Sequence, residues 1–157
     1  MTRIYKIFPV EIYICSISII SMLTDSAENM TMLLSDDEIF YTIEGEGKFA
    51  GMPSVFMRLS MCNLTCKNFA SRDSPHGCDS YVSWTVKNKY TLGQIIDKLE
   101  VYKDHLQNGA ILKITGGEPL IQQVKLQSLL KYLEKRWGFI PVIDFETNGT
   151  LVPSPVF

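Results

Sequence analysis

The sequence predicts an α/β fold with parallel strands, because strand-like and helix-like patterns alternate along it. Apolar, strand-like runs occupy 53–59, 110–115 and 141–146, with two stretches of helical periodicity between them. Polar and glycine-rich motifs follow each run directly, and the carboxyl ends of parallel strands are where such folds bind ligands. The 157 residues contain no internal repeat and suffice for one domain.

The first strand, 53–59, is apolar on both faces except at Arg58, which suits a parallel sheet covered by helices. Before it, 39–43 predicts an extended segment. The Glu-Gly-Glu-Gly sequence at 44–47 predicts a turn, since glycine is unfavourable inside helices and strands. Arg58 is either a strand-end arginine that reaches water or an anion-binding residue, because its guanidinium matches a carboxylate bidentately.

Two helices are predicted between the strands. Thr91 is a suitable N-cap for the first, whose apolar residues recur at helical spacing from Leu92 to Leu106 before Asn108 and Gly109 end it. The second ends at Gly138. Its apolar stripe consists of Leu126, Leu129, Leu130, Leu133 and Trp137.

Both ends of the chain depart from this pattern. Residues 1–31 begin with a weakly basic stretch, which is followed by an apolar run that is too short to span a bilayer. We expect an N-terminal extension over 1–31, from a misassigned start or a disordered segment, and a domain over 32–157; a targeting segment or a packed element are the alternatives. Three strands do not close a barrel, so the sequence predicts a fragment or a partner that covers the open edge.

Composition narrows the function classes. A net charge of −2 provides no basic surface of the kind that binds nucleic acids, so no direct nucleic-acid partner is expected, and no membrane. Four cysteines are too few for a disulfide scaffold in a chain of this size. Clustered cysteines in such a chain indicate metal ligands or catalytic groups, and a reducing cytoplasm fits best.

Cys62, Cys66 and Cys78 lie within seventeen residues after the first strand. A zinc site usually contains a closer cysteine pair and four ligands, and here the fourth would be His76 or Cys15. A disulfide would leave one thiol over and needs an oxidising compartment. An iron–sulfur cluster prefers thiolates, and three of them on a four-iron cluster leave one iron open. The spacing favours the cluster, with zinc as the alternative.

Five motifs in this order resemble the radical S-adenosylmethionine superfamily, and within it the 7-carboxy-7-deazaguanine synthase family. They are EIFYTIEGEG at 38–47, FMRLSMCNLTC at 56–66, CDS at 78–80, TGGEP at 115–119 and ETNG at 146–149. The resemblance implies a partial (β/α) barrel of the radical S-adenosylmethionine type, truncated at its C-terminus.

The resemblance also implies a role for each motif. Cys62, Cys66 and Cys78 would hold a 4Fe-4S cluster whose open iron chelates S-adenosylmethionine. Ser80, where the family usually has threonine, would bind Mg²⁺. The residues that would cradle the cofactor are Gly116, Gly117, Glu118, Glu146, Thr147 and Asn148. Those that would contact a pterin substrate are Ile43, Glu44, Gly45, Arg58 and Thr115.

The implied reaction is a radical ring contraction by a carbon–nitrogen lyase. By family chemistry, a deoxyadenosyl radical abstracts hydrogen from 6-carboxy-5,6,7,8-tetrahydropterin, and ammonia loss gives 7-carboxy-7-deazaguanine for 7-deazapurine (queuosine-type) biosynthesis. The implied partners are this small molecule, an electron donor such as a flavodoxin or ferredoxin, and a second copy in a homodimer. The chain departs from the family in its eleven-residue insertion, 67–77, and in Glu44, which replaces the usual glutamine.

Three other functions remain open at this point. Another radical S-adenosylmethionine enzyme, such as a glycyl-radical activase, would share the cysteines and 115–119 but has no need of 44–47. A zinc-stabilised binding module would have no turnover. An inactive fragment of an enzyme is the third.

Overall fold

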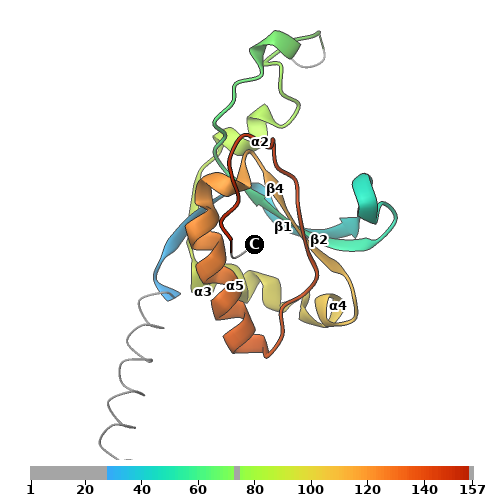
Figure 1. Cartoon of the computed structure of the whole chain (residues 1–157), viewed down its shortest axis with the longest axis vertical. Helices are drawn as coiled ribbons and strands as arrows, with labels where there is room; N and C mark the ends of the chain where they lie inside the picture. Colours follow the sequence, from blue (N-terminus) through green and yellow to red (C-terminus); the bar gives the residue numbers. More distant parts are fainter. Residues whose placement is uncertain (1–27, 73–74, 156–157) are drawn as a thin grey trace, which may run out of the picture.

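The computed structural model describes residues 28–72 and 75–155, which contain a five-stranded sheet in the order β3-β1-β2-β4-β5 (Figure 1). The strands β2, β4 and β5 run parallel, whereas β1 is antiparallel to both β2 and β3. The predicted α/β class with three parallel strands is therefore confirmed. The strands are β1 (Thr31–Ile43), β2 (Pro53–Leu59), β3 (Asn88–Thr91), β4 (Ile111–Gly116) and β5 (Ile143–Phe145).

Two main helices, α3 (Leu92–Glu100) and α5 (Gln123–Trp137), connect the parallel strands. Gly138 ends α5 in the left-handed conformation, with φ of 78°, as its position in the sequence predicts. The shorter elements are α2 (Tyr81–Thr85), α4 (Lys103–Gln107) and the 3-10 turns η1 (Gly47–Phe49), η2 (Lys67–Phe69) and η3 (Pro119–Gln122).

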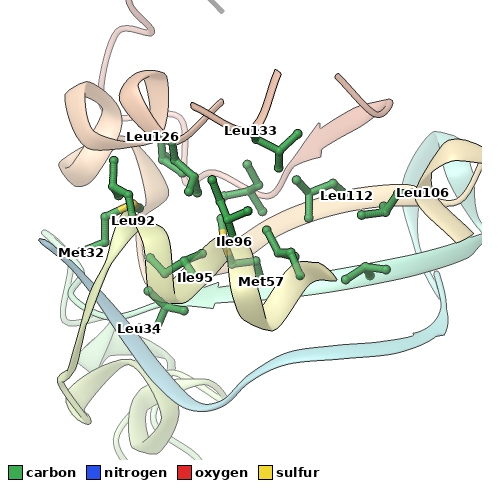
Figure 2. Packing of buried hydrophobic residues seen from close by; sticks show 14 of the residues in the cluster. Met32, Leu34, Met57, Leu92, Ile95, Ile96, Leu106, Leu112, Leu126 and Leu133 are labelled. Carbon is green, nitrogen blue, oxygen red and sulfur yellow. The ribbon is translucent and has the colours of Figure 1, made fainter. Parts of the chain in front are cut away.

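The core lies between these helices and one face of the sheet (Figure 2). The apolar stripe of α3 and that of α5 meet there above Met57 of β2 and Leu112 of β4. Because side chains alternate along a strand, the neighbours Arg58 and Lys113 point to the opposite, concave face. The fully buried helix residues are Leu92, Ile95, Ile96, Leu99, Leu126, Leu129 and Leu133.

The start of α3 is as predicted, and its end is not. Thr91 forms a capping box with Gln94, in which each side chain accepts the other residue's backbone N–H. The predicted single helix to Leu106 is wrong, because α3 ends at Glu100 and α4 follows. The N–H of Tyr102 donates to the Leu99 carbonyl, the tighter hydrogen-bond spacing that ends an α-helix.

The strand that pairs with β2 is longer than the extended segment predicted over 39–43. β1 begins at Thr31 and pairs with β2 from Leu34 onward, with a register shift between Leu34 and Ile39. Its first residues also pair with β3, which the sequence did not predict. The sheet thus contains two strands, β1 and β3, on the β2 side of the three predicted parallel strands.

The predicted boundary between 1–31 and 32–157 falls at the first residue of β1. Residues 1–27 lie outside the described part of the chain, so the interpretations of the extension stay predictions. Within 28–72 and 75–155, no helix is long and apolar enough to cross a membrane.

Candidate iron–sulfur and substrate site

The loops that follow β2 and β4 leave the sheet side by side. Leu59 at the end of β2 is in register with Gly116 at the end of β4. The N–H of Gly117 donates to the Leu59 carbonyl at 3.0 Å, and the N–H of Glu118 donates to the Met61 carbonyl at 2.8 Å. The 116–119 loop is therefore fixed against the backbone that leads into Cys62.

Glycine is required at position 117 by this close approach. A Cβ on Gly117 would lie 2.0 Å from the Met61 carbonyl oxygen and 3.1 Å from the Cβ of Cys62. No side chain fits at such distances, and glycine is the residue that permits this backbone contact. The Gly-Gly pair in the sequence thus serves the contact between the two loops.

Glu118 joins the ends of β4 and β5. Its carboxylate is completely buried and accepts the N–H of Asn148 at 2.7 Å and the hydroxyl of Thr147 at 2.9 Å. It also accepts the N–H of Leu120 at 2.9 Å, which caps η3. A buried carboxylate with several donors is well satisfied, so Glu118 fixes the 146–149 motif beside the cysteine loop.

Asn148 then reaches the first cysteine. Its Nδ2 lies 3.8 Å from the sulfur of Cys62 and 2.9 Å from the Oδ1 of Asn63. The N–H of Leu64 also points to the Cys62 sulfur, at 3.5 Å. Asn63 was not predicted as a site residue, although its place directly after Cys62 is a signal for this contact.

The inserted segment between the second and third cysteines closes on itself. A Cβ on Gly77 would lie 2.0 Å from the carbonyl oxygen of Cys66, so the two backbones are in contact. Figure 1 shows this green segment projecting away from the sheet, beyond α2. Cys78 therefore returns to the neighbourhood of Cys66 in spite of the eleven intervening residues, 67–77.

The three thiols are free and half-buried. In the described part of the chain, no three cysteine, histidine, aspartate or glutamate side chains lie close enough together to bind a single metal ion. A four-iron cluster differs, because each thiolate binds its own iron and the sulfurs need not meet at one point. Three free thiols, with N–H donors directed at Cys62, fit such a group.

A small cavity of about 80 Å³ lies on the concave face next to these loops. Arg58 of β2, Ser80 and Glu146 line it together with Thr115, whose hydroxyl donates to the Glu146 carboxylate. The remaining lining residues are Phe56, Ser83 and Gly116. Five predicted site residues from four separate motifs thus share one cavity.

Arg58 is held at this cavity by aromatic rings. Its guanidinium carbon lies 5.1 Å from the ring centre of Phe40, which itself stacks on Phe56 at 5.3 Å. Among the side chains that the structure describes, those of 28–35, 39–72 and 75–155, no carboxylate forms an ion pair with Arg58. The guanidinium therefore keeps its bidentate donor edge available for an anionic ligand.

Comparison with known families identifies the arrangement. The family described as "4Fe-4S single cluster domain" matches residues 43–148, which is more than half of the chain. The chain belongs to this 4Fe-4S family. The match spans the cysteines and both downstream motifs, so the prediction of an iron–sulfur protein is confirmed.

Individual relatives extend this likeness. The 7-carboxy-7-deazaguanine synthase of Hyperthermus butylicus is 38% identical over 120 residues, covering 75% of this chain and 43% of the relative. The one from Rickettsia prowazekii is 36% identical over 132 residues, covering 79% and 49%. The chain thus spans less than half the length of these two curated relatives. The predicted resemblance to this enzyme family is confirmed.

A solved structure shows the same fold. The crystal structure of QueE from Escherichia coli matches 84% of this chain and 60% of its own, with a TM-score of 0.57 and 22% sequence identity. At that identity the match supports the fold of this 4Fe-4S domain, in agreement with the predicted parallel-stranded α/β class.

The turn at 44–47 of this 4Fe-4S domain lies at the other end of β2. Ile43 pairs with Pro53 and is exposed, and Gly45 has open space around it. Neither residue lines the cavity that contains Arg58. Their predicted contact with substrate stays a prediction.

Glu44 alone turns back to the concave face, where it meets a lysine that was not predicted as a site residue. Its Oε2 lies 2.8 Å from the Nζ of Lys113, and its Oε1 accepts the N–H of Glu46. Burial would raise the pKa of Glu44, but the lysine and the backbone N–H groups of Glu46 and Gly45 outweigh it and hold this pKa below 4.5. The acid that replaces the usual glutamine therefore has its own counter-ion.

Proposed function

We propose that the chain carries out the reaction of 7-carboxy-7-deazaguanine synthase, the ring contraction of 6-carboxytetrahydropterin by a carbon–nitrogen lyase. The observation that supports it most is the position of Arg58, which lines a cavity beside the cysteine loop and has no carboxylate partner among the side chains that the structure describes. Because the chain spans less than half of these relatives' length, their activity, substrate and partners enter here as proposals.

Cys62, Cys66 and Cys78 are the proposed cluster ligands. The free thiols and the N–H donors at Cys62 support this assignment, because such donors stabilise a thiolate that binds iron. When bound, the cluster and S-adenosylmethionine supply one-electron cleavage of the cofactor and the radical that abstracts hydrogen. The proposed cofactor cradle consists of Gly116, Gly117, Glu118, Glu146, Thr147 and Asn148.

Arg58 and Ser80, which both line the cavity, are proposed to bind the substrate and Mg²⁺ respectively. Arg58 would bind the pterin's carboxylate bidentately, with its guanidinium held over the ring of Phe40, which stacks on Phe56. Ser80 would ligate Mg²⁺ through its hydroxyl, which now donates to the carboxylate of Asp79 at 3.0 Å. Thr115, whose hydroxyl donates to Glu146, would also contact the substrate. Ile43, Glu44 and Gly45 are the remaining proposed substrate contacts.

The proposed reaction needs an external electron donor of the flavodoxin or ferredoxin type and a reducing compartment, for which we propose the cytoplasm. A homodimer and a product used in queuosine-type biosynthesis belong to the same proposal.

The test is an anaerobic turnover experiment with the reconstituted chain, S-adenosylmethionine, dithionite and 6-carboxytetrahydropterin, analysed by mass spectrometry. Formation of 7-carboxy-7-deazaguanine supports the proposal. Cofactor cleavage to deoxyadenosine with no deazaguanine would instead indicate another radical enzyme, such as a glycyl-radical activase. A chain that holds the cluster and S-adenosylmethionine but does not cleave S-adenosylmethionine would contradict the activity.

A further inference from the structure

Lys113 occupies an unusual place for a lysine. It lies in the middle of β4 between the core residues Leu112 and Ile114, and its side chain is 4% exposed on the concave face. No motif of the sequence includes it. A buried ammonium is costly unless it is paired and hydrogen-bonded, so its surroundings need an explanation.

The carboxylates of Glu44, Asp144 and Glu146 surround this ammonium. The Nζ of Lys113 lies 2.7 Å from Asp144 Oδ2, 2.8 Å from Glu44 Oε2 and 3.2 Å from Glu146 Oε1. Asp144 is the register partner of Lys113 on β5, whereas Glu44 follows β1. An ammonium has three donors, which equals the number of carboxylates.

This group of one lysine and three carboxylates is more than a neutralised ion pair. One lysine faces three carboxylates, so the group carries an excess of negative charge, and a single acid would satisfy the need for a counter-ion. Burial would lower the pKa of Lys113, but the hydrogen bond to Asp144 and the ion pairs with Glu44 and Glu146 outweigh it and raise the pKa above 10.5. The ammonium therefore stays charged at neutral pH.

One of these carboxylates reaches the cavity. Glu146 lines it with Arg58, whereas Lys113 does not. The Oε1 of Glu146 pairs with Lys113, and its Oε2 accepts the hydroxyl of Thr115, so both oxygens are held from the sheet. The backbone N–H of Glu146 also donates to the Ile114 carbonyl at 3.0 Å. The carboxylate is thus fixed in place although its side chain is 43% exposed.

We propose that Lys113 is a positioning residue that holds Glu146 on the concave face, so that the Glu146 carboxylate receives N–H donors of the bound heterocycle at the cavity. This inference rests on the proposed function, because a pterin combines such donors with the carboxylate assigned to Arg58. A charged acceptor held before binding loses little freedom when the ligand arrives, which favours affinity. Lys113 acts through Glu146 and does not touch the ligand.

The simpler role for Lys113 is that of a counter-ion for Glu44 alone, and paired variants separate the two roles. Lys113→Met leaves three acids without a cation and weakens folding. Lys113→Met combined with Glu44→Gln removes one charge of each sign, which restores stability if the pair is matched. Only in the positioning role does the double variant bind the heterocycle more weakly than Glu44→Gln alone, because Glu146 remains unsupported.

The experiment measures binding and not turnover. Anaerobic calorimetry with 6-carboxytetrahydropterin is carried out on wild type, on Glu44→Gln and on both lysine variants, each loaded with cluster and S-adenosylmethionine. We expect wild type to bind and the double variant to bind about 10- to 100-fold more weakly than Glu44→Gln, the loss typical of a charge-assisted contact. The EPR signal of the reduced cluster should not change.

Two results would overturn the inference. A double variant that binds the pterin as tightly as Glu44→Gln would reduce Lys113 to the counter-ion of Glu44 while leaving the proposed function intact. A loaded wild type that binds S-adenosylmethionine but no pterin would instead remove the proposed function and the inference with it.

Discussion

The Nδ2 of Asn148 lies 3.8 Å from the sulfur of Cys62, although 86 positions separate the two residues in the sequence. The contact exists because β2, β4 and β5 end at the same edge of the sheet and Glu118 holds the Asn148 backbone there. An N–H donor at this sulfur stabilises a thiolate. The end of the third parallel strand therefore takes part in the environment of the first cysteine.

Cys62→Ala should abolish cluster assembly, because three thiolates are the minimum set proposed here. The measurement is iron and sulfide content after anaerobic reconstitution, with about four irons expected in wild type. Cys15→Ala is the matched control and should keep the full content. A Cys62→Ala protein that still holds a complete cluster would overturn the ligand assignment.

Gly117→Ala should disturb the cysteine loop without removing any ligand. The new Cβ would meet the Met61 carbonyl oxygen at 2.0 Å, so one of the two loops must move. We expect lower cluster content and weaker S-adenosylmethionine binding, measured by iron analysis and equilibrium dialysis. Gly45→Ala has open space and should keep both cluster and fold. Equal cluster content in the two variants would show that the close approach is not needed.

Glu118→Gln should lower the free energy of unfolding by about 1–3 kcal/mol, the usual effect of leaving a buried hydrogen-bonding group unsatisfied. The carboxylate accepts from Leu120, Thr147 and Asn148, and an amide cannot accept all three N–H and O–H groups. Urea unfolding followed by circular dichroism measures the change. Glu134→Gln, on the exposed face of α5, is the control and should match wild type.

Stability should depend on pH through Glu44 and Lys113. The pKa of Glu44 is lowered, so its contribution is present above pH 4.5 and is lost as the pH falls further. The pKa of Lys113 is raised, so its contribution is present below pH 10.5 and is lost only as the pH rises beyond that. Neutral pH lies between these limits.

The free energy of unfolding of Glu44→Gln should therefore fall less steeply than that of wild type on the acid side. Between pH 6 and 8 it should vary by no more than about 1 kcal/mol. Urea unfolding at a series of pH values measures the profile. If wild type and Glu44→Gln lose stability equally between pH 5 and pH 3, the acid limit belongs to other carboxylates.

The sequence predicted the parts of the fold that local patterns control. The apolar runs at 53–59 and 110–115 are strands, and Thr91 caps a helix, because hydrophobic periodicity and capping act over a few residues. The convergence of the strand ends was also predictable, since parallel strands present their carboxyl ends at one edge.

Other features depend on tertiary partners and could not be predicted in this way. β3 is four residues long and exists as a strand only because β1 extends back to Thr31 to pair with it. Lys113 was missed because a single lysine within an apolar strand resembles one whose head reaches water. The only local signal was its alternation with Leu112 and Ile114, which places it on the face away from the helices.

The measurement that tests the central claim most directly is low-temperature EPR of the anaerobically reconstituted, reduced chain with and without S-adenosylmethionine. We predict a reduced 4Fe-4S signal that changes when the cofactor is added, because three cysteine ligands leave one iron open to bind it. A signal that stays the same would contradict the open-iron site. Stoichiometric zinc with no iron–sulfur signal would contradict the cluster itself.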